Sequence, residues 1–197
     1  MKYVFYDVET TGLTGRDEVI QFGAIIADEN LLPRAWEVFY CDTQVPIHKD
    51  AQKLHEIDAK TLHTLSNGQT FEDRFFKLPF VNTEDVVWIS YSNGGFDERL
   101  ITQTLRNNGL PKYNFGKKVN YLPKGGGFLY NAYEGIRVRV NNGKPYKLGQ
   151  LVSQLRLTGD GADSMFLKLV GRDASFHDAL YDAFCLWLVV YNYKELL

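Results

Sequence analysis

Three short segments of this chain carry acidic side chains and one histidine at spacings that suit metal-dependent hydrolysis. They are residues 6–12 near the start, 93–97 in the middle, and 177–182 near the end. Carboxylate oxygens are the ligands that hard divalent cations such as Mg²⁺ prefer. A pair of such ions can activate a water and stabilise the leaving oxygen when a phosphodiester is cleaved. The three segments together therefore predict a metal-dependent nuclease.

The first segment places two carboxylates at the end of an expected strand. Residues i and i+2 of a strand point to the same face, so Asp7 and Glu9 are expected to project together. Ligand sites in open α/β sheets lie at the carboxyl ends of strands. Thr10, Thr11 and Gly12 follow, and a glycine there permits close backbone approach to a ligand. For an isolated D-x-E pair, two solvated acids at a strand end are the alternative.

The other two segments each offer one acid in a helical setting. Asp97 is expected in the first turn of a helix, where favourable charge at the helix N-terminus is the alternative role. Asp182 lies among apolar residues, so its burial would require a cation or another partner. His177 and Asp182 are five residues apart, which separates them by about 140° on a regular helix. From the preceding loop, however, His177 could reach the site and take a proton from water near neutral pH.

Strand and helix patterns around these segments predict a mixed α/β fold. The first three strands are joined by short connections, which indicates an antiparallel meander, and strands then alternate with helices. Ser175 and Asp178 are expected to cap the last helix, which gives Asp178 a structural role. The predicted strands are 3–6, 19–27, 35–40 and 86–91, and the predicted helices are 50–65, 71–77, 96–107, 148–157 and 175–193.

Composition and charge fit one globular domain over residues 1–197. The chain is 45% hydrophobic and 23% charged, which allows a sizeable core. Its net charge of −2 argues against a surface that is basic throughout, yet it allows a local basic surface beside an acidic pocket. Cys41 and Cys185 lack metal-ligand spacing. With no signal peptide and no apolar run of bilayer length, we expect a cytoplasmic protein without a membrane segment.

Residues 112–147 form a basic and aromatic segment, expected as an inserted arm with a hairpin strand at 136–140. The segment holds eight Lys or Arg against one acid, Glu134. Cations neutralise phosphates and aromatic rings stack on unpaired bases, so we expect the arm to bind single-stranded nucleic acid. A solvated hairpin whose tyrosines pack on the body is the alternative. The predicted substrate contacts in the arm are Arg137, Arg139, Lys144 and Lys147.

The three segments resemble the motifs of the DnaQ-like 3′→5′ exonucleases of the DEDDh subgroup, in the ribonuclease H-like superfamily. D-x-E-T-T-G-L is matched by residues 7–13, N-x-x-F-D by 93–97, and H-x-A-x-x-D by 177–182. The motifs also occur in the family's order. The resemblance implies a ribonuclease H-like mixed sheet of five strands, an antiparallel meander plus parallel strands, flanked by helices and here carrying a basic hairpin insertion.

The resemblance also implies roles for single residues. Glu9 and His177 would act on the attacking water, with His177 as general base. Residues 54–57 are similar to the family's H-G-I segment, with Glu56 in place of the glycine. The implied ligands of two divalent cations, Mg²⁺ or Mn²⁺, are Asp7, Glu9, Asp97 and Asp182. The implied substrate contacts are Thr10, Thr11, Leu13, Asn93 and Phe96.

The expected activity is hydrolysis from the 3′ end of single-stranded nucleic acid, with DNA favoured and nucleoside 5′-monophosphates released. A proofreading, repair or phage-type role is expected, and a DNA polymerase is a candidate partner. Two alternatives stay open: an exoribonuclease that trims RNA 3′ ends, and a catalytically idle module that binds nucleic acid on the same fold. No residue identified here reads the 2′-OH by which proteins distinguish RNA from DNA.

Overall fold

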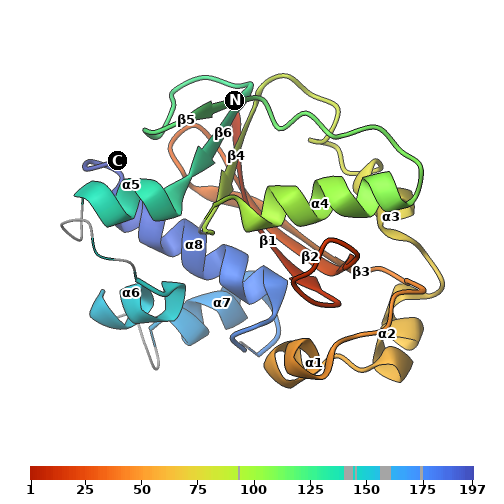
Figure 1. Cartoon of the computed structure of the whole chain (residues 1–197). Coiled ribbons are helices and arrows are strands. Elements are labelled where there is room, and N and C mark those ends of the chain that lie inside the picture. The colour runs from red at the N-terminus through yellow and green to blue at the C-terminus, as the bar shows by residue number, and fades with distance from the viewer. Residues whose placement is uncertain (93, 140–143, 145, 156–160, 174) are drawn as a thin grey trace.

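The computed structural model describes the whole chain except residues 93, 140–143, 145, 156–160 and 174 (Figure 1). Its centre is a six-stranded mixed sheet in the order β3-β2-β1-β4-β6-β5. The strands β1, β2 and β3 pair antiparallel, whereas β4 is parallel to β1, β6 to β4, and β5 to β6. The bounds are β1 Lys2–Thr10, β2 Val19–Ala27, β3 Pro33–Tyr40, β4 Val86–Ser90, β5 Lys117–Val119 and β6 Phe128–Asn131.

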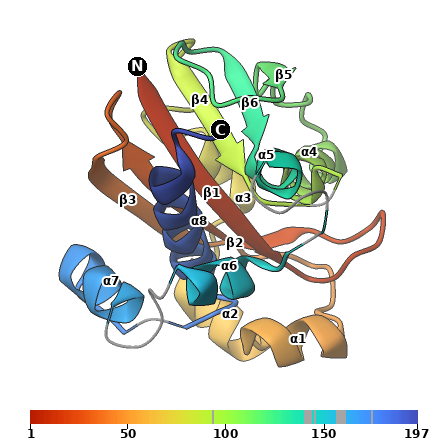
Figure 2. The ribbon, with the colours of Figure 1, turned by 90° about the vertical axis from the view of Figure 1, so that its left-hand side faces the viewer.

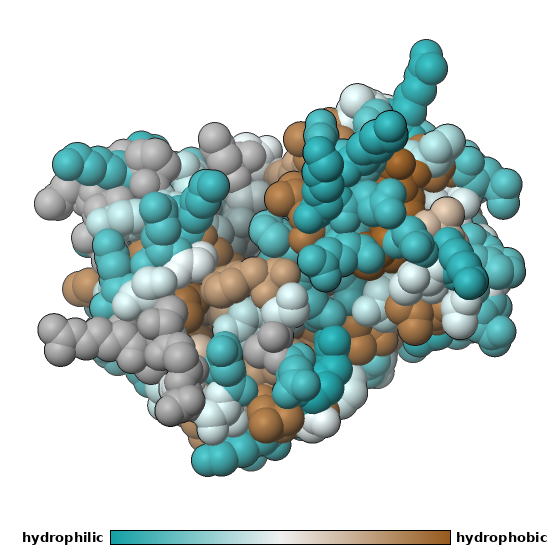
Figure 3. All heavy atoms as spheres, turned by 90° about the horizontal axis from the view of Figure 1, so that it is seen from below, coloured by the Kyte–Doolittle hydropathy of each residue, from teal (hydrophilic) through white to brown (hydrophobic). Residues whose placement is uncertain are grey.

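Helices cover both faces of the sheet. The long helix α8 lies across β1 and β2 on one face, together with α5 and α6, and α4 packs with α3 on the other face (Figures 1 and 2). In the part of the chain that the structure describes, no helix is long and apolar enough to cross a bilayer. Seen from below, the surface mixes hydrophilic and hydrophobic residues (Figure 3). The bounds are α1 Lys49–His55, α2 Ala59–Ser66, α3 Phe71–Phe75, α4 Phe96–Asn107, α5 Ala132–Arg139, α6 Leu148–Gln154, α7 Ala162–Val170 and α8 Ala179–Tyr193.

The alternation of β1 decides which face receives the acids. Tyr3 and Phe5 are buried in the core cluster beneath α8, whereas Val4 and Tyr6 are buried in the cluster beneath α4. Side chains two apart share a face, so Asp7 and Glu9 continue the row of Tyr3 and Phe5. A register slip by one residue would move this whole row to the other face. Burial of the two apolar rows therefore directs both carboxylates toward α8.

The mixed sheet and its antiparallel meander are confirmed, but the segment 112–147 differs from the expected arm. Two short strands in it, β5 and β6, join the sheet beyond β4, which gives six strands where five were predicted. Residues 132–139 form the helix α5, and residue 140 lies outside the described residues. The prediction of a basic hairpin strand at 136–140 was therefore wrong.

The reason lies in long-range packing. Ala132 and Ile136, spaced by one helical turn, are both buried in the core beneath α8 together with Tyr130. Gly135 allows this close packing, because a Cβ there would lie 2.0 Å from the hydroxyl oxygen of Tyr130. Burial of one helix face thus outweighs the β propensity of the alternating residues.

Two helix boundaries also differ from prediction. The expected helix 50–65 is divided into α1 and α2, because Glu56 adopts a left-handed φ of 59° and Asp58 caps α2 by accepting from the backbone of Thr61 at 2.6 Å. The last helix begins at Ala179 instead of residue 175. The helix α7 was not predicted.

Candidate active site

The site is centred on the carboxyl end of β1. Asp7 pairs with Gly23 of β2 and Glu9 pairs with Gln21 in the antiparallel register. Gly23 allows the start of α8 to lie directly on this strand pair. A Cβ at Gly23 would be 2.2 Å from the backbone nitrogen of Leu180 and 2.3 Å from the carbonyl carbon of Ala179. The first turn of α8 is therefore held against the strand that carries Asp7.

A set of hydrogen bonds fixes the start of α8. Asp178 is its N-cap and accepts from the backbone nitrogens of Leu180 at 3.0 Å and Tyr181 at 3.2 Å. Arg172 binds the same carboxylate with two bonds of 2.7 and 2.9 Å. Gln21 donates to Asp178 at 3.2 Å and accepts from the backbone nitrogen of Ala179 at 3.1 Å. The structural role predicted for Asp178 is confirmed. Ser175, expected to cap the helix with it, instead donates its hydroxyl to the carbonyl of Phe176 at 3.2 Å.

The cap places His177 outside the helix, in the loop before it. His177 has a left-handed φ of 63°, and its backbone nitrogen donates to Oδ2 of Asp182 at 3.2 Å. One potential ligand atom from each of Glu9, His177 and Asp182 lies within 4.8 Å of the others. The angular separation expected on a regular helix therefore does not apply, and the imidazole faces the carboxylates.

Asp97 approaches the carboxyl end of β1 from α4, which covers the sheet face opposite to α8. After β4 the chain turns through Gly94 and Gly95, both with left-handed φ, and α4 starts at Phe96. Asp97 is 3% exposed, so it is almost entirely buried. Among the described residues, Oδ2 of Asp97 and Oδ1 of Asp182 are buried without a hydrogen-bond partner. Such orphaned carboxylate oxygens are costly unless a cation compensates them.

Burial raises the pKa of all four carboxylates. Burial, then the charges of Asp97, Asp182 and Glu9, raises the pKa of Asp7 well above its usual value. Burial, then the charges of Asp182 and Asp97, raises the pKa of Glu9 to about 9. Burial is the first cause for Asp97 and Asp182, whose pKa is raised to about 7. Four acids of this kind cannot all ionise without added positive charge. The donor set thus fits hard divalent cations.

The loop after β1 presents one of the predicted substrate residues to solvent. Leu13 is 74% exposed. The Thr11 hydroxyl is buried, donating to Asp17 at 2.8 Å and accepting from the backbone nitrogen of Glu18 at 3.0 Å. The Thr10 hydroxyl donates to the carbonyl of Gly12 at 2.7 Å. Both threonine side chains thus shape the loop, and Leu13 is exposed together with residues 14–16 that follow it.

Asp17 organises this loop, although the sequence analysis did not single it out. Its carboxylate also accepts from the backbone nitrogen of Thr14 at 2.6 Å. Burial opposes ionisation, but the hydrogen bonds from Thr14 and Thr11 outweigh it and lower the pKa of Asp17. An acid in a short polar loop between two predicted strands was the available signal in the sequence.

His55 ties α1 to the end of β1. Its Nδ1 accepts from the backbone nitrogen of Ile57 at 3.0 Å, so Nε2 carries the proton and faces the carbonyl of Thr10 at 3.3 Å. Burial, aided by the charge of His177, lowers the pKa of His55 against the effect of the Thr10 carbonyl. Glu56, where the glycine of H-G-I was expected, adopts the left-handed conformation that favours glycine.

The structure gives only the local surroundings of the remaining predicted contacts. Phe96 is half-buried, with the guanidinium carbon of Arg99 5.2 Å from its ring centre. Asn93 lies outside the described residues. In α5, Arg137 forms an ion pair of 2.8 Å with Glu134. Substrate contacts by Arg137 and by the exposed Arg139, Lys144 and Lys147 stay predictions.

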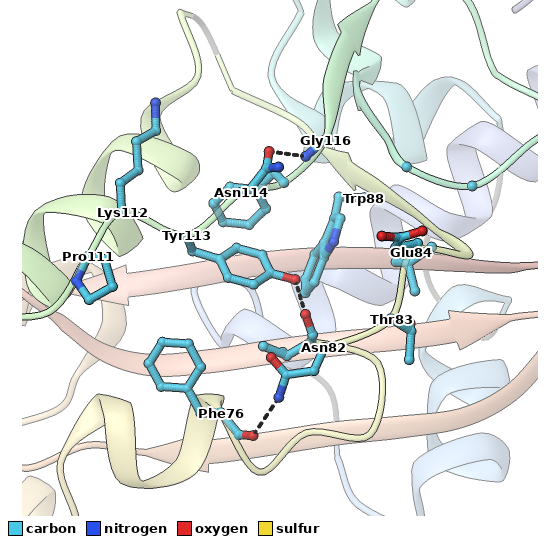
Figure 4. Close-up of a pocket in the computed structure, with 15 residues that line it drawn as sticks. Phe76, Asn82, Thr83, Glu84, Trp88, Pro111, Lys112, Tyr113, Asn114 and Gly116 are labelled. Atoms are coloured by element: carbon cyan, nitrogen blue, oxygen red, sulfur yellow. Dashed lines mark hydrogen bonds between the residues drawn. The ribbon is translucent and has the colours of Figure 1, made fainter.

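A separate hollow lies at the amino end of β4, opposite to the end that leads to Asp97 (Figure 4). Its volume is about 610 Å³, and the aromatic side chains of Phe76, Trp88 and Tyr113 line it. The Tyr113 hydroxyl donates to the carbonyl of Val81. The four acids and His177 do not line this hollow, so it is distinct from the candidate active site.

Comparisons with known proteins point to exonucleases. The sequence pattern of the exonuclease family RNase_T matches residues 4–189. A comparison with curated proteins gives no match. Among solved structures, Escherichia coli exonuclease I in complex with a dT13 oligonucleotide is 18% identical, with a TM-score of 0.67 over 99% of this chain and 41% of that one. A moderately thermophilic exonuclease I from Methylocaldum szegediense is 19% identical, with a TM-score of 0.68 over 98% of this chain and 40% of that one.

The chain therefore spans about two fifths of the length of these exonuclease I structures. At such identities the likeness concerns the fold. It confirms the predicted ribonuclease H-like architecture, a mixed sheet with helices on both faces.

Proposed function

Because this chain belongs to the RNase_T exonucleases, a DnaQ-like family of the ribonuclease H-like superfamily, we propose that it degrades single-stranded nucleic acid from the 3′ end with two divalent cations. The chain is thus a nuclease by family, and the direction, the substrate and the metals are the proposal. The observation that carries it is the convergence of Asp7, Glu9, Asp97, Asp182 and His177 at one strand end. A single domain spanning residues 1–197 would be sufficient to hold this site.

Asp7, Glu9, Asp97 and Asp182 would hold Mg²⁺ or Mn²⁺. When bound, such ions lower the pKa of a water and offset negative charge on the scissile phosphate and the leaving oxygen. The buried oxygens of Asp97 and Asp182 that lack a partner support this assignment. A structural ion pair could also satisfy buried acids, but in the described part of the chain no Lys or Arg forms an ion pair with these four.

His177 would be the general base. Its imidazole would take a proton from the water that attacks phosphorus, as the new P–O bond forms and the bond to the 3′ oxygen breaks. The shortened strand would take a proton from solvent, and a nucleoside 5′-monophosphate would leave. His177 is exposed, so it can return its proton to bulk water between turnovers. Leu13, which protrudes beside the site, would separate the terminal base from its neighbour.

DNA is the proposed substrate over RNA. The exonuclease I structures with dT13 and dA16 oligonucleotides support this choice by similarity of fold. A proofreading, repair or phage-type role with a DNA polymerase as partner belongs to the same proposal. Trimming of RNA 3′ ends is the second candidate, because none of the residues assigned here would distinguish a 2′-OH.

Digestion of matched 5′-labelled DNA and RNA strands in Mg²⁺ or Mn²⁺ tests the proposal, with Asp7→Ala as the control. We expect a ladder that shortens from the 3′ end, faster on DNA and absent in the variant. Cleavage of neither strand by the wild type would contradict the enzyme and favour a module that binds nucleic acid. Faster digestion of RNA would replace DNA by RNA as the substrate.

A second variant isolates the histidine. Loss of a general base costs about 10²–10⁴-fold in rate. We therefore expect His177→Gln to lower kcat by that amount while the protein remains folded. Wild-type turnover by His177→Gln would refute the assignment of the base while leaving the metal site intact.

A further inference from the structure

A groove runs along α4 and starts beside the candidate active site. Its volume is about 590 Å³. One wall is a stripe of α4 in which residues recur every three or four positions, from the first turn to the last. The other wall is the segment 112–118, which leads from the connection after α4 into β5 (Figure 1). The residues of the α4 wall are Glu98, Arg99, Thr102, Gln103 and Arg106.

The charge of this groove is positive. Arg99 and Arg106 line it from α4, and Lys112 and Lys118 line it from the facing segment. All four side chains are exposed, and none of them forms an ion pair with a described residue. The acid that lines the groove, Glu98, is buried and accepts from the Ser90 hydroxyl at 2.6 Å. Four exposed cations thus face one shielded carboxylate.

One end of the groove adjoins the carboxylates. Gly94 and Gly95 line it, and they lie three and two residues before Asp97. A Cβ at Gly94 would meet nothing within 4 Å, and one at Gly95 would lie 3.0 Å from Oε2 of Glu98 and 3.5 Å from Nζ of Lys118. The bare backbone leaves room for a strand to pass from the acids into the groove.

The facing wall is held rigidly. The segment 112–116 separates the groove from the aromatic hollow of Figure 4, because its residues line both. Tyr113 packs edge-on against Trp88 and Phe115, with ring centres 5.7 and 4.8 Å away. Asn114 accepts from the backbone nitrogen of Gly116 at 3.0 Å. Lys112 therefore precedes a segment that packs on the body of the protein, and Lys118 lies in β5, which pairs with β6.

We propose that this α4 groove binds the phosphates of the single strand upstream of the 3′ end. The inference rests on the proposed function and adds the path of the substrate. From Gly95 to Arg106 the helix rises by about 16 Å, since each residue adds about 1.5 Å. A stacked strand advances about 3.4 Å per nucleotide, so the groove holds at most about five nucleotides. The phosphates of the strand are neutralised by Arg99, Arg106, Lys112 and Lys118. No contact with the bases is assigned, so binding does not depend on their sequence.

The groove differs from the predicted track on residues 137–147. Arg137 is engaged by Glu134, whereas the four groove cations have no acidic partner among the described residues. The α4 groove also reaches the backbone next to Asp97. Both surfaces can be tested in the same experiment.

The experiment compares three quadruple variants, each with four cations changed to Gln. They are the groove variant R99Q/R106Q/K112Q/K118Q, the rival variant R137Q/R139Q/K144Q/K147Q, and a control of equal charge, K2Q/K60Q/K168Q/K194Q, whose lysines are exposed elsewhere. Binding of a 5′-labelled 20-nucleotide DNA strand is measured by fluorescence anisotropy in EDTA over a salt series. Hydrolysis of the p-nitrophenyl ester of thymidine 5′-monophosphate in Mn²⁺ reports the active site without an upstream strand.

We expect the groove variant to bind the strand at least tenfold more weakly than the control does at 100 mM salt. Each lost phosphate contact lowers the slope of log affinity against log salt by about 0.7, so four contacts lower it by about 3. Hydrolysis of the ester should stay within twofold of wild type. Equal binding by the groove variant and the control, or a larger loss in the rival variant, would overturn the proposal. A wild type that binds the strand but leaves the ester intact would instead refute the proposed function.

Discussion

Replacement of Gly23 by alanine tests how the site is assembled. The added methyl would lie 2.2 Å from the backbone nitrogen of Leu180, and ordinary contact begins at 3.4 Å. The two nearest atoms, the backbone nitrogen of Leu180 and the carbonyl carbon of Ala179, belong to the main chain, so no side-chain rotation can relieve the clash. The start of α8 would have to retreat by about 1 Å, the shortfall between these two distances.

Two magnitudes follow from this displacement. Overpacking of a close contact costs about 1–3 kcal/mol of unfolding free energy. A misplacement of about 1 Å in a catalytic constellation can cost about 10²-fold in rate. Asp182 and His177 both flank the displaced turn, so we expect Gly23→Ala to lose about 10²-fold in kcat even where it remains folded.

Urea unfolding and hydrolysis of a labelled strand measure both effects. Gly125→Ala is the matched control, because its Cβ would meet only a ring carbon of Phe128 at an ordinary 3.8 Å. The control should change stability by less than about 0.5 kcal/mol. If Gly23→Ala is destabilised but fully active at low temperature, the contact between β2 and α8 does not position Asp182 and His177. If Gly23→Ala matches the control in both assays, the close approach itself is refuted.

Four further outcomes are expected. Mg²⁺ or Mn²⁺ should raise the Tm of the wild type but not that of Asp7→Ala in a thermal scan, because binding to the folded state alone stabilises it; an equal rise in both would exclude this site. With the pKa of Asp97 and Asp182 raised to about 7 and that of Glu9 to about 9, the metal-free folded state holds more protons than the unfolded chain. Its unfolding free energy should therefore fall from about pH 4 to pH 9, and a flat profile by urea unfolding in EDTA would contradict these shifts. Asp182→Asn should abolish hydrolysis yet raise the Tm in EDTA at pH 8, since it removes one repelling charge; a lower Tm would mean that the carboxylate stabilises the metal-free fold. Asp178→Ala should lower the free energy of unfolding in urea by about 1–2 kcal/mol through loss of the cap, and an unchanged midpoint would show that the cap does not stabilise the fold.

The residues of the candidate site were predictable from local pattern, because each lies where its element makes it conspicuous. Asp7 and Glu9 share a strand face by period two, and Asp182 is an acid within an apolar helix. The structure brings these three together with Asp97 and His177. Their chemical roles remain the proposal made above.

What local pattern could not predict depends on contacts between distant parts of the chain. Gln21 and Gly23 fix the start of α8 across more than 150 positions, and a single glycine or glutamine in a strand carries no local sign of that. The strands β5 and β6 have three and four residues, too short for a clear alternation. The α5 segment alternates like a strand, and only burial of Ala132 and Ile136 decides for the helix.

The position of α8 in the chain also bears on when activity can arise during synthesis. Asp7 lies in the first strand and Asp182 in the last helix, so the growing chain carries the first acid long before the last one is made. That same helix fills the core over β1 and β2, so the sheet face beneath it stays uncovered until α8 docks. A nascent chain that lacks α8 would hold neither the complete ligand set nor His177 at the strand end. If the proposed function holds, a chain that ends before α8 should therefore lack nuclease activity.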